Sequence, residues 1–450
     1  SIMADQHSYQ QKKGATAQIV VVGALAFCGP GLFNALNGLG NAGSSDPTIA
    51  ALANGFLYCT FAICGYFGGA AFNLFGPVPL LSLGGLTYAI YALCIYYSAQ
   101  FKLLAILGGV ILGLGAGLFW TAQGSLMMAY ATAQSRGRLI AIFWIIFNLG
   151  GVVGGLLQFS LNFHTDGGGA NPLSYFAFVI TMVLGALSAP FVLASPSSVE
   201  REDGSAVVFE QADSPIEEIR AAFEAIGDPF IKCNLLFYLA SNWFYTYDFN
   251  GFNAQQFNVR TRGLNSAIFW SAQMLAAWGF GKILDANESP RTRAWNGMSL
   301  VLIGLVFSFI MALRDSTSIV CDGHLGWDKG KPCHLDFLTD FPNSIRPMLV
   351  FILLGAVDAI YQNYAYWLMS MAAGSDVRKT VMYSAVYKGV QSLGAGIAWL
   401  IDLEPTASYW SQGALCLVLT VGACFPVMRT FRSLDADKKF DGPESSKLEY

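Results

Sequence analysis

The stretch that decides the fold is Asp228 to Asp285, which reads DPFIKCNLLFYLASNWFYTYDFNGFNAQQFNVRTRGLNSAIFWSAQMLAAWGFGKILD. Two apolar segments flank a loop rich in Asn, Gln and Arg, and each is close to the length of about 20 residues that a helix needs to cross a bilayer. Asp248 lies inside the first segment, where a carboxylate is costly and is expected to face protein or water. Gly251, next to Asn250, marks a place where the helix is expected to unwind near its outer end. This pattern is typical of half of a solute site in a membrane transporter.

The composition of the whole chain supports a membrane protein. Of its 450 residues, 54% are hydrophobic and 12% are charged, and the mean hydropathy is +0.48. Soluble domains carry roughly 25% charged residues. The sequence has no basic patch, no zinc-type cysteine spacing and no phosphate-binding loop, so neither nucleic acid nor a cofactor is expected as a partner. No nucleophile–base or paired-carboxylate constellation appears at a membrane face, which argues against an enzyme.

Counting apolar segments of spanning length predicts twelve transmembrane helices and an all-α polytopic fold. The first is expected to direct insertion by itself. The only long polar break, residues 195–227, separates six spans from six and contains a predicted amphipathic helix at 214–226. The predicted spans are 18–40, 48–73, 78–99, 103–133, 138–163, 173–195, 229–251, 264–285, 294–313, 346–373, 379–402 and 408–429. The predicted domains are an N-terminal tail (1–17), a six-helix bundle (18–195), a linker (196–228), a second six-helix bundle (229–430) and a C-terminal tail (431–450).

The distribution of positive charge predicts the orientation of the chain. Most of its 25 lysines and arginines fall in the tails and loops that share a side with the N-terminus, and the positive-inside rule places that side in the cytosol. Both tails are therefore expected to be cytosolic. Cys321 and Cys333 then fall in one outer loop, an oxidising setting in which a disulfide can form.

Several uncharged polar or aromatic side chains lie within the predicted spans and are candidates for a binding site. The first span contains Gly29-Pro30-Gly31, which is expected to kink or break the helix, and Asn34 and Asn37 follow on one face. The fourth span holds Trp120 and Gln123, and the fifth holds Trp144 and Asn148. Each of these is also compatible with ordinary packing and hydrogen bonding between helices.

Three ionisable residues lie inside the membrane and away from the ends of their spans, namely Asp248, Asp358 and Lys388. Such groups are costly and are usually paired. Spans ten and eleven are consecutive and antiparallel, so Asp358 and Lys388 are the candidate pair. A structural ion pair and a proton-linked or solute-linked switch remain two alternatives for them.

Glycines recur at a spacing of four within spans four and five. Gly109, Gly113 and Gly117 are one such series, and residues 150–155 contain two more pairs. Small residues at this spacing let helix backbones approach closely. Static packing and sliding of these helices during a transport cycle are both compatible with the pattern.

Four strings in the chain point to a family: GPGLFNALNGLGNAG (29–43), LFWTAQGSLMMAY (118–130), GRLIAIFWIIFNLGGVVGGL (137–156) and SNWFYTYDFNGFNAQQFNVRTRGLN (241–265). Together with the six-plus-six plan, they resemble the fungal branch of the Unc-ninety-three-like family within the major facilitator superfamily. That family is named for a potassium-channel regulatory protein.

The resemblance covers about Ala17 to Arg429 and implies the facilitator fold, with two six-helix bundles, a central cavity and alternating access. It does not imply a substrate, because some animal members are regarded as trafficking or channel-regulating proteins. The usual charged facilitator motif after span two is replaced here by the uncharged sequence NLFGPVP (73–79). Arg136-Gly137-Arg138, between spans four and five, is expected to take over part of its role.

Three functions remain open from the sequence. The first is a secondary transporter of a small organic solute, with proton coupling through Asp248 or Asp358 as an added possibility. The second is a non-transporting partner that regulates another membrane protein, and the third is a lipid or sterol handler. The protein is expected to be a monomer in the plasma membrane or an endomembrane. The predicted substrate-binding residues are Asn34, Asn37, Trp120, Gln123, Asn148, Asn242, Tyr245, Asp248, Gln362 and Lys388.

Overall fold

The computed structural model describes residues 13–40, 44, 46–164, 171–207, 209, 214–321, 323–326 and 328–432, so the predicted tails lie largely outside it. The α-helices are α1 (Ala15–Ala26), α2 (Leu32–Gly38), α3 (Pro47–Tyr66), α4 (Gly68–Phe75), α5 (Pro77–Tyr96), α6 (Lys102–Ala129), α7 (Arg136–Leu161), α8 (Pro172–Val192), α9 (Pro215–Ala225), α10 (Pro229–Ala240), α11 (Val259–Leu284), α12 (Pro290–Ser318), α13 (Phe341–Ala373), α14 (Val377–Asp402) and α15 (Tyr409–Val427). Two π-helical segments occupy Phe27–Gly31 and Tyr247–Ala254, and short 3-10 turns occupy Tyr97–Ala99, Pro196–Ser198 and Met428–Arg432. Four two-residue strands, β1 (Lys13–Gly14), β2 (Val199–Glu200), β3 (Val320–Cys321) and β4 (His324–Leu325), form a parallel β1–β2 pair and an antiparallel β3–β4 pair.

Local sequence explains where many of these helices begin. A side chain that accepts hydrogen bonds from the first-turn amides is followed directly by a proline, whose missing N–H is not needed at that position. This arrangement begins α3 at Asp46-Pro47, α8 at Asn171-Pro172, α9 at Ser214-Pro215, α10 at Asp228-Pro229 and α12 at Ser289-Pro290.

The described residues contain a helical segment at each of the twelve predicted spans. Within the described part of the chain, nine are long and apolar enough to cross by length and composition alone. The other three, at the predicted spans 229–251, 264–285 and 379–402, are α10 with the π-helix that follows it, α11, and α14. They are shorter or more polar than the rest, and they supply most of the polar side chains described below.

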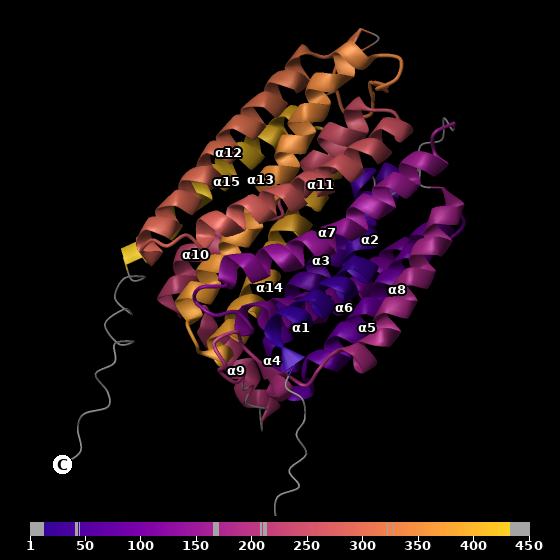
Figure 1. Ribbon diagram of the computed structural model, residues 1–450. Helices are drawn as coiled ribbons and strands as arrows, with labels where there is room; N and C mark the ends of the chain where they lie inside the picture. The colour runs from indigo at the N-terminus through magenta and orange to yellow at the C-terminus, as the bar shows by residue number, and fades with distance from the viewer. Residues whose placement is uncertain are drawn as a thin grey trace, which may run out of the picture.

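The crossing helices form two six-helix bundles that lie side by side (Figure 1). The first, from α1 to α8, is drawn in indigo to magenta, and the second, from α10 to α15, in pink to yellow. The bundles meet along two seams, with α7 packed along α11 and α3 packed along α14. The resemblance noted above predicts a cavity in the space between the bundles.

Glycines at the predicted spacing permit close helix contacts both within a bundle and between bundles. A Cβ atom at Gly109 of α6 would lie 2.2 Å from the carbonyl oxygen of Ala53 in α3. A Cβ atom at Gly155 of α7 would lie 2.7 Å from the backbone nitrogen of Ala267 in α11, on the seam between the bundles. Larger side chains at these positions would force the backbones apart.

The two predicted helix breaks take a different form from the one expected. The Gly29-Pro30-Gly31 sequence does not break the first span, because the backbone stays helical and widens into a π-helix at Phe27–Gly31. In the seventh span, α10 ends at Ala240, turns follow at 241–244, and the Asn250-Gly251 region is π-helical rather than unwound. Each π segment changes the direction in which the following side chains point, which matters for the site.

The linker helix α9 touches both bundles. Glu218 accepts hydrogen bonds from Asn73 Nδ2 of α4 (2.7 Å) and from an Arg378 guanidinium nitrogen of α14 (2.8 Å). The Tyr66 hydroxyl of α3 also donates to the Ala222 carbonyl (2.5 Å). Helix α9 therefore lies across the end of the seam between α4 and α14, at the lower end of the molecule in Figure 1.

Candidate functional site

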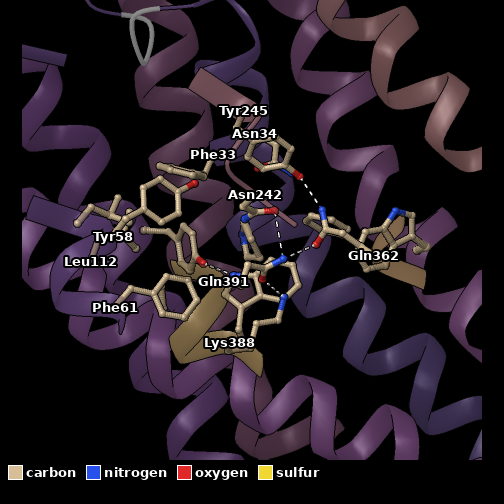
Figure 2. Close-up of a pocket in the computed structure, with 17 residues that line it drawn as sticks. Phe33, Asn34, Tyr58, Phe61, Leu112, Asn242, Tyr245, Gln362, Lys388 and Gln391 are labelled. Carbon is tan, nitrogen blue, oxygen red and sulfur yellow. Dashed lines mark hydrogen bonds between the residues drawn. The ribbon is translucent and has the colours of Figure 1, made fainter. Parts of the chain in front are cut away.

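A cavity lies between the two bundles, enclosed by side chains from both (Figure 2). Its volume is about 40 Å³, which is room for a few water molecules rather than for an organic solute. The lining residues are Pro30, Phe33, Asn34, Leu57, Tyr58, Phe61, Tyr88, Leu112, Ala116, Trp120, Trp144, Phe147, Asn242, Tyr245, Gln362, Lys388 and Gln391.

The first bundle forms an aromatic and aliphatic wall, which is on the left in Figure 2. Phe33 packs edge-on against Tyr88, with ring centroids 5.5 Å apart. The indole N–H of Trp120 donates to the Tyr88 hydroxyl (2.9 Å), so the one polar atom of that indole is satisfied within the wall. Phe61 and Leu112 lie on the same side of the cavity. We refer to the lining residues from α1 to α8 as the apolar wall.

The second bundle contributes five polar lining residues, which we call the polar wall: Asn242, Tyr245, Gln362, Lys388 and Gln391. Gln391 is at its centre. Its Oε1 accepts a hydrogen bond from Lys388 Nζ (2.8 Å), and its Nε2 lies 3.0 Å from Gln362 Oε1 and 3.2 Å from Asn242 Oδ1. An amide nitrogen has only two protons, so Gln391 can change partners as its surroundings change.

Asp358 and Lys388 are not in direct contact, so the predicted ion pair is wrong for this conformation. The Asp358 carboxylate accepts hydrogen bonds from Gln362 Nε2 and Gln273 Nε2, each 2.6 Å long. Gln362 Oε1 in turn accepts a hydrogen bond from Gln391 Nε2, and Gln391 Oε1 accepts one from Lys388 Nζ. The two charges are thus separated by a chain of two glutamine side chains, because each charged group finds a nearer amide partner.

Lys388 sits among aromatic rings with 3% of its surface exposed. Its Nζ lies 4.5 Å from the ring centre of Trp120, 4.9 Å from that of Tyr387 and 5.2 Å from that of Tyr366. Ring faces attract a cation, and the attraction grows as water is removed. The ammonium group is therefore held in the cavity by three rings and one amide oxygen, without a carboxylate within 4.0 Å among the described residues.

Gln273 carries the polar network across to the first bundle, and the sequence analysis missed it. Its Oε1 accepts from the Trp144 indole N–H (3.0 Å) and from Asn148 Nδ2 (3.2 Å), while its Nε2 donates to Asp358. Gln391 was missed as well. Both are amides at buried positions of apolar spans, and Gln391 is three residues after Lys388, one helical turn away.

Three predicted binding residues lie outside the cavity. Asn37 is turned toward α3, where its Oδ1 accepts from Asn54 Nδ2 (3.3 Å). Gln123 lies against the second bundle, with its Oε1 3.5 Å from the Tyr366 hydroxyl. Asn148 contributes to the Gln273 network rather than to the lining.

Asp248 is a fourth predicted residue that does not line the cavity. It is 1% exposed and belongs to the π-helix at Tyr247–Ala254. Neither of its carboxylate oxygens has a hydrogen-bond partner among the described residues. It faces protein, as expected, and it is not among the residues that line the cavity, so its contact with a solute stays a prediction.

The end of the bundles that is predicted to face the cytosol is closed by contacts between α7 and the second bundle. Arg136 Nε donates to the Ser370 hydroxyl of α13 (2.8 Å). Asp285, at the end of α11, accepts from the backbone N–H groups of Gly137 (2.8 Å) and Arg138 (2.6 Å). A carboxylate at the N-terminus of a helix is favoured by the helix dipole. Arg136-Gly137-Arg138 thus makes cross-bundle contacts, although the loop at 73–79 has no charge.

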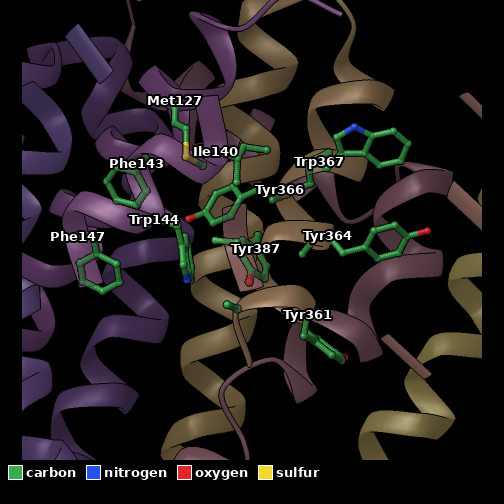
Figure 3. Close-up of a cluster of buried hydrophobic side chains, with 14 of the residues drawn as sticks. Met127, Ile140, Phe143, Trp144, Phe147, Tyr361, Tyr364, Tyr366, Trp367 and Tyr387 are labelled. Carbon is green, nitrogen blue, oxygen red and sulfur yellow. The ribbon is translucent and has the colours of Figure 1, made fainter. Parts of the chain in front are cut away.

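A cluster of aromatic rings lies between the bundles next to the cavity (Figure 3). Tyr366 of α13 points between Trp144 of α7 and Tyr387 of α14, with ring centroids 6.3 Å and 5.2 Å away, respectively. Met127 and Phe143 of the first bundle lie close by in the same view. Trp144 also lines the cavity, so the cluster is continuous with the cavity lining.

The opposite end, predicted to be outside, is also closed. Asn253 Nδ2 donates to the carbonyl of Gly38 in the first bundle (2.8 Å), and an Arg260 guanidinium nitrogen donates to the carbonyl of Phe163 (3.0 Å). Arg260 also pairs with Asp336. Burial acts to raise the pKa of Asp336, but hydrogen bonds from Arg260 and from a backbone amide hold that pKa below its ordinary value. The two bundles therefore contact each other at both ends.

The loop between α12 and α13 covers this outer end. Cys321 and Cys333 are joined by a disulfide, with their Cα atoms 5.2 Å apart. The Cys333 N–H donates to the Gln255 carbonyl (2.8 Å), and Gln255 Nε2 donates to the Lys331 carbonyl (2.8 Å). The bridged loop is therefore attached to the end of the π-helix that precedes α11.

A family model and two relatives identify the family of the chain. Residues 19–399 match the model of the Major Facilitator Superfamily. The chain is 38% identical to "UNC93-like protein 1" of Arabidopsis thaliana over 392 residues, which cover 86% of this chain and 83% of that protein. It is 34% identical to an UNC93-like protein of Schizosaccharomyces pombe over 419 residues, covering 91% and 80% of the two chains.

The fold resembles a solved structure of the xylose transporter XylE from E. coli in a partially occluded inward-open conformation. The TM-score is 0.62, the sequence identity is 13%, and the match covers 97% of this chain and 99% of XylE. At that identity the likeness concerns the fold alone.

Proposed function

The chain belongs to the major facilitator superfamily and, within it, to the UNC93-like proteins, and from this premise we propose that it is a secondary active transporter of a small organic solute. The fold and the family make it an integral multi-pass membrane protein and not an enzyme. The observation that carries the proposal is the enclosed cavity between the bundles, with an apolar wall on one side and a polar wall on the other.

The position and chemistry of this cavity favour solute binding over simple packing. Ionisable and amide groups inside a membrane protein are costly, and they commonly mark a solute or ion pathway. Here one ammonium group and four further polar side chains of the second bundle converge on the same space. Binding sites with few polar groups and mostly aromatic surroundings are typical for small organic molecules.

The transport mechanism that suits this arrangement is alternating access. The two bundles, taken as 18–195 and 229–430, would rock against each other around the cavity, with the linker at 196–228 spanning them. The Arg136 and Asp285 contacts would separate at the cytosolic end in one state, and the Asn253 and Arg260 contacts at the outer end in the other. Because each end is held by a few hydrogen bonds, either can open without unfolding a bundle.

Proton coupling would act through Asp358. Its carboxylate is joined to Lys388 through Gln362 and Gln391, so a change in its charge would alter which amide partners are available beside the solute. Asp248 lies outside this chain of contacts and is given no part in coupling.

A regulatory partner of another membrane protein is the second candidate, and one observation favours it. The cavity, at about 40 Å³, is largely filled by side chains. For a transporter, this small volume corresponds to an occluded state without solute, which must expand to bind. For a regulatory protein, it would be the permanent form.

A binding assay followed by a transport assay distinguishes a transporter from a regulatory partner. Purified protein is screened by thermal shift against amino acids, nucleobases, sugars and organic acids, since a ligand that binds only the folded state raises the melting temperature. Each hit is then tested for counterflow in proteoliposomes, with protein-free liposomes as the control. We expect one chemical class to give saturable counterflow. No hit in any class, together with a membrane protein that co-purifies in a fixed ratio, would overturn the transport function.

A further inference from the structure

We infer that the solute is an organic monoanion with a flat and largely apolar body, whose anionic group binds the Lys388 ammonium. The inference rests on the proposed transport function and names the class of solute that the cavity takes. It follows from the charge, the hydrogen bonding and the shape of the two walls.

The cavity lining contains one basic side chain and no acidic one. Lys388 is the only Lys, Arg, His, Asp or Glu among the lining residues. The nearest carboxylate, Asp358, is 1% exposed and does not line the cavity, and its oxygens are occupied by the amides of Gln362 and Gln273. A solute inside the cavity can therefore contact Lys388 directly, whereas the Asp358 carboxylate is separated from the cavity by Gln362.

The Lys388 ammonium has capacity for another partner. It carries three N–H donors, and one is used on Gln391 Oε1 (2.8 Å). The ring centres of Trp120 and Tyr387 lie 4.5 Å and 4.9 Å from Nζ, and no second hydrogen bond of Nζ is found among the described residues. A carboxylate oxygen accepts a hydrogen bond from an ammonium more strongly than a neutral amide does, so an anionic group can displace Gln391, which has other partners within reach.

Neutral amides in the cavity lining suit the second oxygen of a carboxylate. Asn34 and Asn242 both line the cavity, one from each bundle, and an amide N–H can donate to a carboxylate oxygen. Figure 2 shows Asn242 between Lys388 and Tyr245, near the middle of the space. An anion at this place would be bound by groups from both bundles.

The rest of the cavity favours a flat apolar body. The apolar wall presents the rings of Phe33, Tyr58, Phe61, Tyr88 and Phe147. Aromatic faces bind flat groups through dispersion and edge-to-face contacts. The single cation limits the solute to one negative charge, because a second would remain buried without a partner.

Matched ligands test the charge and the body separately. The affinities of phenylacetate, phenylacetamide and acetate for the purified full chain are measured by calorimetry at pH 7, with thermal shift as the second readout. Phenylacetate and phenylacetamide have nearly the same shape and differ in charge, whereas acetate keeps the charge and lacks the ring. We expect phenylacetate to bind about 30-fold more tightly than either of the others, as a hydrogen bond to a charged group predicts.

Two variants test whether the anionic group binds Lys388. In Lys388→Met, which retains a long unbranched side chain, phenylacetate affinity is expected to fall about 30-fold while phenylacetamide affinity changes less than threefold. Lys388→Arg keeps the charge and is expected to retain most of the phenylacetate binding. If Lys388→Met does not fold, the comparison of ligands on the unmodified protein still decides the matter.

The possible outcomes distinguish failure of the monoanion inference from failure of the transport function. Equal binding of phenylacetate and phenylacetamide, or tight binding confined to neutral solutes, overturns the monoanion and leaves a transporter of neutral solutes. Preference for the anion that survives in Lys388→Met removes Lys388 as its binding group. No binding or counterflow by any class of solute, with a folded protein, overturns the monoanion and the transport function together.

Discussion

The two walls of the cavity differ in kind. The first bundle supplies most of the lining residues, and these are mainly aromatic and aliphatic. The second bundle supplies five, and all are polar, with Gln391 joining Lys388 to the amides around it. Neither wall alone would hold an amphipathic anion, because one has no basic side chain and the other has only the ring of Tyr245.

Because the two walls differ, solute binding is expected to favour one state of the transport cycle. A solute that needs both walls binds best when the bundles are close together, so its binding favours the closed cavity by its differential affinity for that state. The polar wall would then set which solute is accepted, and the apolar wall would set how much of its body is buried. Changes in the two walls should therefore have separable effects.

The largest effect is expected for Gln391→Glu. This change places a carboxylate where Gln391 Oε1 now lies, 2.8 Å from Lys388 Nζ. The new ion pair would neutralise the cation, so phenylacetate affinity should fall about 30-fold. The carboxylate cannot replace the Nε2 donor that bonds Gln362 and Asn242, so the melting temperature should fall. Phenylacetamide binding, measured by calorimetry on the same variant, is the control. Unchanged phenylacetate binding would show that the charge of the polar wall does not select the solute.

A smaller effect on binding is expected for Asp358→Asn. An asparagine has one acceptor oxygen for the two amide donors of Gln273 and Gln362, so one donor loses its partner at a cost of about 1–3 kcal/mol. Chemical denaturation should show this loss, and phenylacetate affinity should fall about fivefold as Gln362 changes partners.

Asp402→Asn is the matched control for Asp358→Asn. Asp402 is also a buried acid that accepts from two amides, Asn250 Nδ2 (2.9 Å) and Gln412 Nε2 (3.1 Å), and it pairs with Lys329 (3.3 Å). None of these partners belongs to the polar wall. This variant should lose stability without losing affinity. If both variants lose affinity equally, the hydrogen bonds that join Asp358 to Lys388 through Gln362 and Gln391 have no specific effect on solute binding.

Trp120→Leu tests the apolar wall. It removes a ring that lines the cavity and that faces Lys388 at 4.5 Å. Aromatic and cation–π contacts of this kind contribute about 0.5–1.5 kcal/mol, so phenylacetate affinity should fall about three- to tenfold and acetate affinity should change little. Trp410→Leu, at a 44% exposed position of α15, is the control. An equal loss for acetate and phenylacetate would contradict the separate roles of the walls.

The smallest effect is expected for Asp248→Asn. Asp248 lies outside both walls, and its oxygens have no hydrogen-bond partner among the described residues. Removing a buried carboxylate without a partner should leave the melting temperature unchanged or raise it. Counterflow and its pH dependence should match the unmodified protein, and a loss of either would return Asp248 to the transport pathway.

The sequence was sufficient for the fold because spanning length and apolar composition are properties of each segment alone. It also identified most of the polar wall, since Asn242, Tyr245, Gln362 and Lys388 are polar groups in spans where such groups are rare. It did not identify Gln391, because a neutral amide in an apolar span gives a weaker indication than a charge.

Two of the predicted site residues that do not line the cavity are associated with π-helices, where the sequence predicted a helix break or unwinding. A π-helix precedes Asn37 in its span, and Asp248 lies within another. A π-helix alters the phase of the helix, so residues beyond it face other neighbours. The predicted contact between Asp358 and Lys388 failed for a different reason: side-chain amides reach each charge first, and this cannot be inferred from the spacing of spans.

The measurement that tests alternating access most directly is the distance between the bundles at each end. Spin labels at Gln134→Cys and Ser375→Cys report on the predicted cytosolic end, and labels at His164→Cys and Thr339→Cys report on the outer end, because all four positions are exposed. The accessible native cysteines are first replaced by serine. We predict two populations, in which one pair lengthens while the other stays short, and a shift toward short distances at both ends with phenylacetate. One fixed distance at each end, with and without ligand, would contradict transport by alternating access.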